Sequence, residues 1–121
     1  MMKLATVITV LATPAFAQPT TLEAFQANNI MRGCRQAIIE ESRAETFLGG
    51  VCMGIVGTIA FAGKPGVLGI APSDRFCLPA GVNTGQAVRV AVAYIDARPA
   101  RLHEQFSDLA VEAFREAWPC R

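Results

Sequence analysis

The chain has 121 residues, of which 52% are hydrophobic and 17% charged, and its formal net charge at pH 7 is +1. A surface that binds nucleic acid usually has a clear excess of Lys and Arg. The charge balance therefore argues against nucleic acid as a partner and against simple electrostatic attraction to anionic lipid.

The first 17 residues have the pattern of a secretory signal peptide. Lys3 precedes an uncharged apolar run from Leu4 to Ala12, and Ala15-Phe16-Ala17 has small residues at the two positions that a signal peptidase selects. A membrane anchor is the alternative, but the run is well short of the roughly 20 residues that span a bilayer. We expect cleavage after Ala17 and a single helical domain of residues 18–121, located in the periplasm and without membrane attachment.

The first expected helix opens at Thr20, where Thr20-x-x-Glu23 matches a capping box. Apolar residues then recur at spacings of three and four, which places them on one face of a helix. These residues are Ala27, Ile30, Met31, Cys34 and Ile38.

The second expected helix, Phe47 to Ala62, contains no charged residue and four glycines. Gly50-x-x-x-Gly54 matches a helix-contact pattern of membrane proteins, so a membrane segment is one interpretation. Sixteen residues are short for a span, and a small exported domain needs a core helix. We therefore expect a helix that is buried on all sides, with glycines that let neighbouring helices approach.

The third and fourth helices follow a glycine- and proline-rich loop, Gly63 to Arg75. Asn83 is a suitable N-cap for the third helix and Gln86 completes a capping-box variant. Pro99 suits the first turn of the fourth, whose apolar face steps by three and four. That face consists of Leu102, Phe106, Leu109, Ala113 and Ala117. The sequence thus predicts an all-α fold, a compact bundle of about four helices.

Four cysteines in a short exported chain indicate two disulfides. A short connection around Pro99 makes the last two helices antiparallel. Cys77, just before the first of them, and Cys120, just after the second, then lie at one end of the hairpin. This favours Cys77–Cys120 and leaves Cys34–Cys52, although the sequence leaves the other two pairings open.

No catalytic or metal-binding motif is evident. No two cysteines stand at the Cys-x-x-Cys distance and His103 is the only histidine, so zinc-site spacing is absent. Paired cysteines supply no thiolate nucleophile, and we interpret His103 as a first-turn helix residue. The carboxylates Glu104, Asp108, Glu112 and Glu116 repeat every four residues, as on a solvated helix face. We expect no enzyme, no metal and no cofactor.

Three sequence segments resemble the Rap/Tai family of type VI secretion amidase immunity proteins. They are Phe76-Cys77-x-Pro79-x-Gly81-Val82-x-x-x-Gln86, Tyr94-Ile95-x-x-x-Pro99-x-x-Leu102-His103 and Trp118-Pro119-Cys120. Cys52-x-Gly54 is similar to an upstream family motif. The chain departs from the family at Ile55-Val56, where Tyr-Ile is usual.

The resemblance implies a helical periplasmic protein, often a homodimer, that blocks a peptidoglycan-cleaving amidase effector injected by neighbouring cells. Two other functions are compatible with a small, disulfide-bonded helical domain. One is a chaperone-like acid-stress protein of the periplasm, which should expose apolar surface at low pH. The other is an orphan helical binding protein without an effector.

The Gly63–Arg75 loop is the candidate effector-binding surface, because it is the longest segment without helical periodicity and loops on rigid scaffolds often serve recognition. Three apolar residues, Val67, Leu68 and Ile70, have no helical face to join, and Lys64, Asp74 and Arg75 could form a charged rim around them. The alternative is that the apolar residues fold back over the second helix as core cover.

Overall fold

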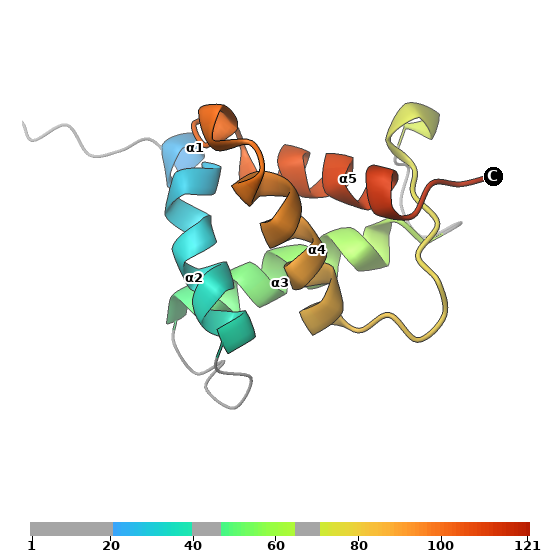
Figure 1. Cartoon of the computed structure of the whole chain (residues 1–121), viewed down its shortest axis with the longest axis horizontal. Helices are drawn as coiled ribbons and strands as arrows, with labels where there is room; N and C mark the ends of the chain where they lie inside the picture. The colour runs from blue at the N-terminus through green and yellow to red at the C-terminus, as the bar shows by residue number, and fades with distance from the viewer. Residues whose placement is uncertain (1–20, 40–46, 65–70) are drawn as a thin grey trace, which may run out of the picture.

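A computed structural model of the chain describes residues 21–39, 47–64 and 71–121 (Figure 1). The expected signal peptide and its cleavage position lie outside these residues. In chain order the elements are α1 Thr21–Ala24, α2 Ala27–Ile39, α3 Phe47–Ala62, the 3₁₀ turn η1 Pro72–Asp74, α4 Thr84–Asp96, the 3₁₀ turn η2 Pro99–Arg101 and α5 Phe106–Ala117. The four longer helices, α2 to α5, form a compact bundle, which confirms the predicted fold class.

The core lies where these four helices meet. α2 packs most closely against α3, and α4 packs against α5 as the antiparallel hairpin that the sequence predicts; α3 and α2 also contact α4. Fully buried side chains come from all four of these helices and from the segment before α4. The largest are Phe76, Phe106, Phe114, Met31, Ile95, Leu109 and Val56.

The first expected helix is interrupted, so the prediction of one continuous helix is wrong. α1 ends at Ala24 and α2 begins at Ala27. The break is held by the distant turn before α5, because Ala27 N–H donates to the Glu104 carbonyl and Phe106 N–H donates to the Phe25 carbonyl, at 2.9 and 3.0 Å. Backbone groups from another part of the chain thus satisfy the open end of α2.

α3 has the predicted bounds, but the prediction that it is buried on all sides is wrong. Gly49, Cys52, Val56 and Ala60 form one buried stripe. Although α2, α4 and α5 all pack against α3, its side chains Phe47, Leu48 and Phe61 are exposed. No helix among the described residues is long and apolar enough to cross a membrane.

The start of α4 agrees with the sequence, whereas the start of the fourth predicted helix does not. Asn83 caps α4 by accepting a hydrogen bond from the Gln86 N–H at 2.8 Å. Pro99 begins the short turn η2 instead of a helix, and α5 starts only at Phe106. His103 therefore lies in the intervening turn and not in a first helical turn. The Leu102 and Glu104 carbonyls in this turn accept N–H groups of α2.

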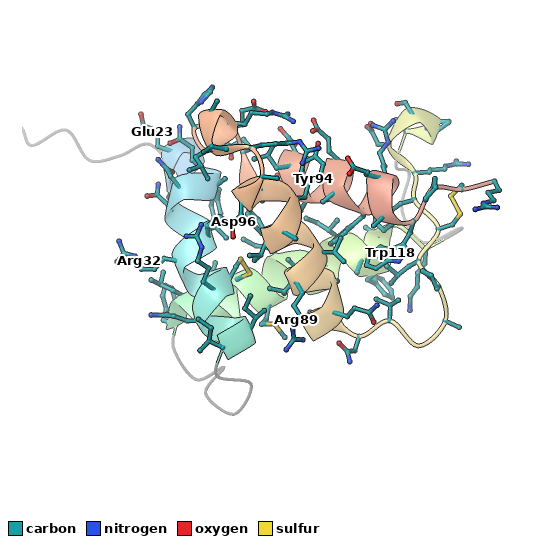
Figure 2. The ribbon with its side chains drawn as sticks, viewed as in Figure 1. Glu23, Arg32, Arg89, Tyr94, Asp96 and Trp118 are labelled. Carbon is teal, nitrogen blue, oxygen red and sulfur yellow. A yellow bond between two sulfur atoms is a disulfide. The ribbon has the colours of Figure 1, made fainter. Side chains whose placement is uncertain are left out.

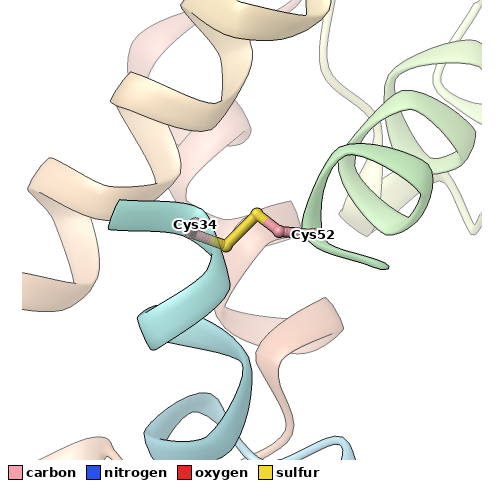
Figure 3. The surroundings of a disulfide bond; sticks show 2 residues. All are labelled: Cys34 and Cys52. Carbon is pink, nitrogen blue, oxygen red and sulfur yellow. A yellow bond between two sulfur atoms is a disulfide. The ribbon is translucent and has the colours of Figure 1, made fainter. Parts of the chain in front are cut away.

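Both predicted disulfides are present. Cys34–Cys52 joins α2 to α3 and is fully buried (Figure 3), whereas Cys77–Cys120 joins the segment before α4 to the chain after α5 and is exposed. Each bridge connects elements that also pack against each other. The disulfides therefore fix the relative positions of α2 and α3 and of the two ends of the last hairpin.

Candidate functional site

The segment proposed from the sequence for partner binding begins and ends at one point on the bundle. Gly63, directly after α3, lies against the ring of Phe76, and a Cβ at position 63 would overlap the ring atoms. The Phe76 ring is buried and packs edge-on against Phe114, with centroids 5.3 Å apart. The chain therefore leaves the bundle after Gly63 and returns to it at Phe76 at adjacent positions.

The far end of this segment is fixed by three further contacts. Cys77 N–H donates to the Trp118 carbonyl at 2.8 Å, and the Cys77–Cys120 disulfide adds a covalent link at the same place. The Trp118 ring lies 5.5 Å from the ring of Phe114. The described residues on both sides of positions 65–70 are therefore held by packing and by a covalent link.

The six residues proposed for partner binding do not all fall within the described structure. Val67, Leu68 and Ile70 lie outside the described residues. Lys64, Asp74 and Arg75 are described, and all three are exposed.

Lys64 borders a shallow hollow between α3 and the segment that leads into α4. Its ammonium group lies 5.6 Å from the centre of the Phe61 ring. The hollow has a volume of about 240 Å³. Its lining residues are Gly57, Ala60, Phe61, Lys64, Leu78, Val82, Asn83 and Thr84.

Asp74 borders a different hollow, of about 550 Å³, between η1 and α5. Its carboxylate lies 3.8 Å from the guanidinium of Arg115. The lining residues are Ala71, Asp74, Asp108, Val111, Glu112 and Arg115. The structure thus places Lys64 and Asp74 at separate hollows near the base of the 64–75 segment.

The α5 residues of this second hollow were not selected from the sequence. Asp108, Val111, Glu112 and Arg115 are spaced by three, four and seven residues, which puts them on one helix face. Two of them, Asp108 and Glu112, belong to the four-residue repeat of carboxylates that is typical of a solvated helix face. Helical spacing alone could have grouped the four, but it gives no sign that η1 lies opposite them.

A polar cluster next to this hollow joins η2 to α4 and α5, with Tyr94 at its centre (Figure 2). Arg101 donates to Glu112 at 2.6 Å and to Glu104 at 2.7 Å, and the Tyr94 hydroxyl donates to Glu112 at 2.8 Å. Arg98 lies over the Tyr94 ring, with its guanidinium carbon 3.6 Å from the ring centre. The carboxylates of this face are therefore largely engaged in holding the last hairpin together.

These contacts shift the ionisation of the groups involved. The hydrogen bonds from Arg101 hold the pKa of Glu112 down at about 2, and they also lower the pKa of Glu104. Burial, followed by the hydrogen bond to Glu112, raises the pKa of Tyr94. Both carboxylates are therefore anionic at neutral pH, and the cluster presents fixed charges and no group that exchanges protons near pH 7.

Among the described residues there is neither a free thiol nor a cluster of potential metal ligands. All four cysteines are in disulfides, and no group of three or more His, Cys, Asp or Glu side chains in this part of the chain is placed to hold a metal ion. What the site offers is shape and charge: two hollows, an apolar helix face and a base held by a disulfide.

A family model, that of Rap1a immunity proteins, matches residues 26–120 of the chain. The match includes all four cysteines and reaches further toward the N-terminus than the segments that suggested the resemblance. Searches of curated proteins and of solved structures returned no match. Several residues of the family-like segments have clear structural tasks here: Phe76 in the core, Gly81 with a φ of 90°, and Cys77 with Cys120 in a disulfide.

Proposed function

The chain belongs to the Rap1a immunity protein family, and from this premise we propose that it is a periplasmic protein that protects the cell wall. It does so by binding and blocking a peptidoglycan-amidase effector of a type VI secretion system. The observation that supports the proposal most strongly is the family match over residues 26–120. The effector class and the compartment follow from the resemblance of the family-like segments and from the signal-peptide pattern, and they are part of the proposal.

The two disulfides support an exported location, because disulfides persist in oxidising compartments such as the periplasm. We propose that residues 1–17 are removed on export and that residues 18–121 form the active protein. A cell wall amidase acts in the same compartment, so the inhibitor and its target would meet there.

We propose inhibition by occlusion, with no catalysis by the immunity protein itself. An inhibitor of this kind needs a rigid surface that covers the active site of the enzyme. The base formed by Gly63, Phe76 and the Cys77–Cys120 disulfide gives the 64–75 segment a rigid support. The pairing of all four cysteines and the hydrogen bonds that engage Glu104 and Glu112 are consistent with this proposal.

The proposed contact surface is the 64–75 segment together with its two flanking hollows. The proposed contact residues are Lys64, Val67, Leu68, Ile70, Asp74 and Arg75. We also include Asp108 on α5, because it lines the same hollow as Asp74. The two hollows carry different charges: Lys64 lines the hollow next to α3, and Asp74 lines the hollow next to α5. A partner that fits would place an acidic group near the first and a basic group near the second.

The proposed function is tested by measuring inhibition directly. The mature protein is purified with both disulfides and mixed with a peptidoglycan-amidase effector of a type VI secretion system, and release of peptidoglycan fragments is followed. We expect a stoichiometric complex and loss of amidase activity, with no cleavage by the mature protein alone. Undiminished amidase activity at equimolar protein would contradict the immunity role, and cleavage by the protein alone would contradict the proposed lack of catalysis.

A chaperone-like acid-stress function is a second candidate, favoured by the exposed apolar face of α3. Such a protein binds many unfolded clients, whereas an immunity protein binds one folded enzyme. Suppression of client aggregation at acid pH, in the absence of any amidase, would favour this alternative.

A further inference from the structure

We propose that the hollow beside Lys64 receives one apolar side chain of the effector, and that Lys64 pairs with an effector carboxylate next to that side chain. The inference rests on the proposed function, because it takes the effector as the occupant. It gives the contact surface a specific anchor point and states the chemistry of the effector residues that are recognised there.

The size of this hollow suits a single side chain. Its volume is about 240 Å³, whereas pockets for small-molecule ligands are about 300–1,000 Å³. Protein interfaces gain much of their affinity from a few side chains that fill concave sites of the partner. The hollow is therefore better matched to one residue of a protein than to a free ligand or cofactor.

The α3 side of the hollow is open because Gly57 has no side chain. Gly57 and Ala60 are three residues apart, so they lie on one face of the helix, and both line the hollow. Packing does not require glycine at position 57, since a Cβ there would make ordinary contact with Thr84 at 3.6 Å. At Gly63, by contrast, a Cβ would overlap the Phe76 ring. The missing side chain at Gly57 therefore leaves space that a partner can fill.

The opposite wall is a turn that is held by its own backbone contacts. Val82 N–H donates to the Pro79 carbonyl at 3.3 Å, and Gly81 between them has a φ of 90°. Asn83 then accepts a backbone N–H from the first turn of α4 at 2.8 Å. This turn belongs to the first family-like segment. Because its backbone is fixed before a partner arrives, little ordering entropy is lost on binding.

The interior of the hollow is largely apolar. Phe61 is 55% exposed, and Leu78 and Val82 are partly exposed, so a side chain that enters would remove apolar surface from water on both sides. Such burial is favourable in proportion to the area that is covered. An aromatic side chain would also pair with the Phe61 ring, which makes it the best-fitting occupant.

Lys64 gives the rim of the hollow a positive charge. Among the described residues that line it, Lys64 alone is charged, and no described carboxylate forms an ion pair with it. Its ammonium group lies 5.6 Å from the centre of the Phe61 ring, which keeps the charge close to the apolar opening. Charges at the rim of an interface mainly determine specificity and the rate of association. The matching group on the effector is therefore a carboxylate beside the inserted side chain.

The hollow beside Asp74 does not offer the same kind of anchor point. Its Glu112 accepts hydrogen bonds from Arg101 and from the Tyr94 hydroxyl, and Asp74 lies 3.8 Å from the Arg115 guanidinium. An apolar side chain that entered there would take these charged groups out of water, which is costly.

The first experiment fills the hollow from α3. Gly57→Leu is compared with Gly54→Leu, because Gly54 is on the same helix but does not line the hollow, and a Cβ there would meet nothing within 4 Å. We expect Gly57→Leu to bind a type VI peptidoglycan-amidase effector about tenfold more weakly in calorimetry, as for loss of a central contact, and Gly54→Leu to bind like wild type. Gly57→Ala should have a smaller effect of the same sign. All three variants should melt no lower than wild type, since glycine is the poorer helix former.

The second experiment removes the charge at the rim. Lys64→Met keeps most of the apolar stem, and Arg32→Met is the matched control because Arg32 is an exposed cation on α2. We expect Lys64→Met to associate several-fold more slowly with the amidase at low salt and to approach wild type at high salt, where the attraction is screened. The control should associate like wild type at both salt concentrations.

The third experiment tests the hollow without any amidase. N-acetyl-phenylalanine carries an apolar side chain beside a carboxylate, and N-acetyl-phenylalanine amide is its neutral counterpart. In ¹H–¹⁵N spectra of the mature protein, we expect millimolar N-acetyl-phenylalanine to shift the amide signals of Lys64, Val82 and Thr84 more than the neutral probe does. Neither probe should shift them in Gly57→Leu.

Four results would overturn the proposal. They are undiminished amidase binding by Gly57→Leu, equal weakening by Gly54→Leu, a melting temperature of Gly57→Leu well below wild type, or no shift of these amide signals by the probe. Equal weakening would assign the contact to the exposed face of α3, and the lower melting temperature would show that residues of this chain already fill the space. If wild type inhibits no amidase, the proposed function fails, and the probe alone then decides whether the hollow takes an apolar group beside a carboxylate.

Discussion

Gly63 and the ring of Phe76 are in direct contact, at the point where the chain leaves α3 and the point where it returns before α4. The contact depends on the absence of a side chain and not on an unusual backbone, because Gly81 is the only described residue with a positive φ. It brings the two ends of the 64–75 segment together, close to the exposed Cys77–Cys120 disulfide.

Replacement of Gly63 by alanine should destabilise the protein. The new methyl group would overlap the buried Phe76 ring, and overpacking of this kind costs typically 1–3 kcal/mol. We expect a loss of about 2 kcal/mol and a melting temperature lower by roughly 10 °C for a domain of this size. Thermal unfolding by circular dichroism measures the change, and Gly54→Ala in dilute solution is the control that should show no such loss.

Gly33→Ala should be the more damaging of the two substitutions. A Cβ at Gly33 would overlap the backbone carbonyl of Leu48, so relief requires α2 and α3 to separate, whereas a ring such as Phe76 can shift. The Cys34–Cys52 disulfide opposes that separation. We expect Gly33→Ala to lower the free energy of unfolding by more than Gly63→Ala in denaturant titrations, and an equal or smaller loss would contradict the close packing of α2 on α3.

The sequence predicts those parts of this fold that depend on local patterns. The cap at Asn83, the bounds of α3 and the pairing of Cys77 with Cys120 all follow from spacing and composition. The exposed side of α3 was not predicted, because a helix without charged residues and with Thr58 as its one hydroxyl residue gives little sign of which face meets solvent. The break at Phe25 depends on backbone hydrogen bonds to the turn 102–106, which has no local signal.

The candidate site could also be predicted only in part. The lack of helical periodicity in the 64–75 segment marks its residues as candidates, and Lys64, Asp74 and Arg75 are exposed in the structure. The opposite wall of the Asp74 hollow comes from Asp108, Val111 and Arg115 on α5. Its position follows from the packing of Phe76 on Phe114, a contact between residues far apart in the sequence.

Stability should depend on acid pH through Glu112. Its pKa is about 2 in the folded protein because of Arg101, below the value of about 4.3 expected in the unfolded chain. The ionised group therefore stabilises the fold above about pH 4.3, and this contribution is lost as the pH falls toward 2. Glu112 is partly exposed, so solvent screening makes the effect modest. Wild type and Glu112→Gln should differ in melting temperature at pH 6 and converge near pH 2, and a constant difference would contradict this assignment.

The two disulfides should differ in their response to reductant. Cys77 and Cys120 are exposed, whereas Cys34 and Cys52 have no exposed surface, and access to sulfur limits thiol–disulfide exchange. We expect a dithiol such as dithiothreitol to open Cys77–Cys120 first. Timed alkylation followed by peptide mass spectrometry measures both rates under native conditions. Equal rates, or earlier labelling of Cys34 and Cys52, would show that the core opens as readily as the C-terminal end.

The last prediction separates the two interpretations of the apolar residues in the 64–75 segment. If Leu68 and Ile70 contact the effector, their double replacement by serine should weaken amidase binding at least tenfold in calorimetry, because buried apolar contacts are lost from the interface. The melting temperature should change little, since contact residues are exposed in the free protein. Ile39→Ser is the matched control, because Ile39 is 79% exposed at the end of α2, a helix that contributes no residue to either hollow at the base of the segment. If the two residues instead cover α3, the double variant should melt well below wild type, whereas the control should not. A large drop in melting temperature, or unchanged affinity for the amidase, would place the contact surface elsewhere on the bundle.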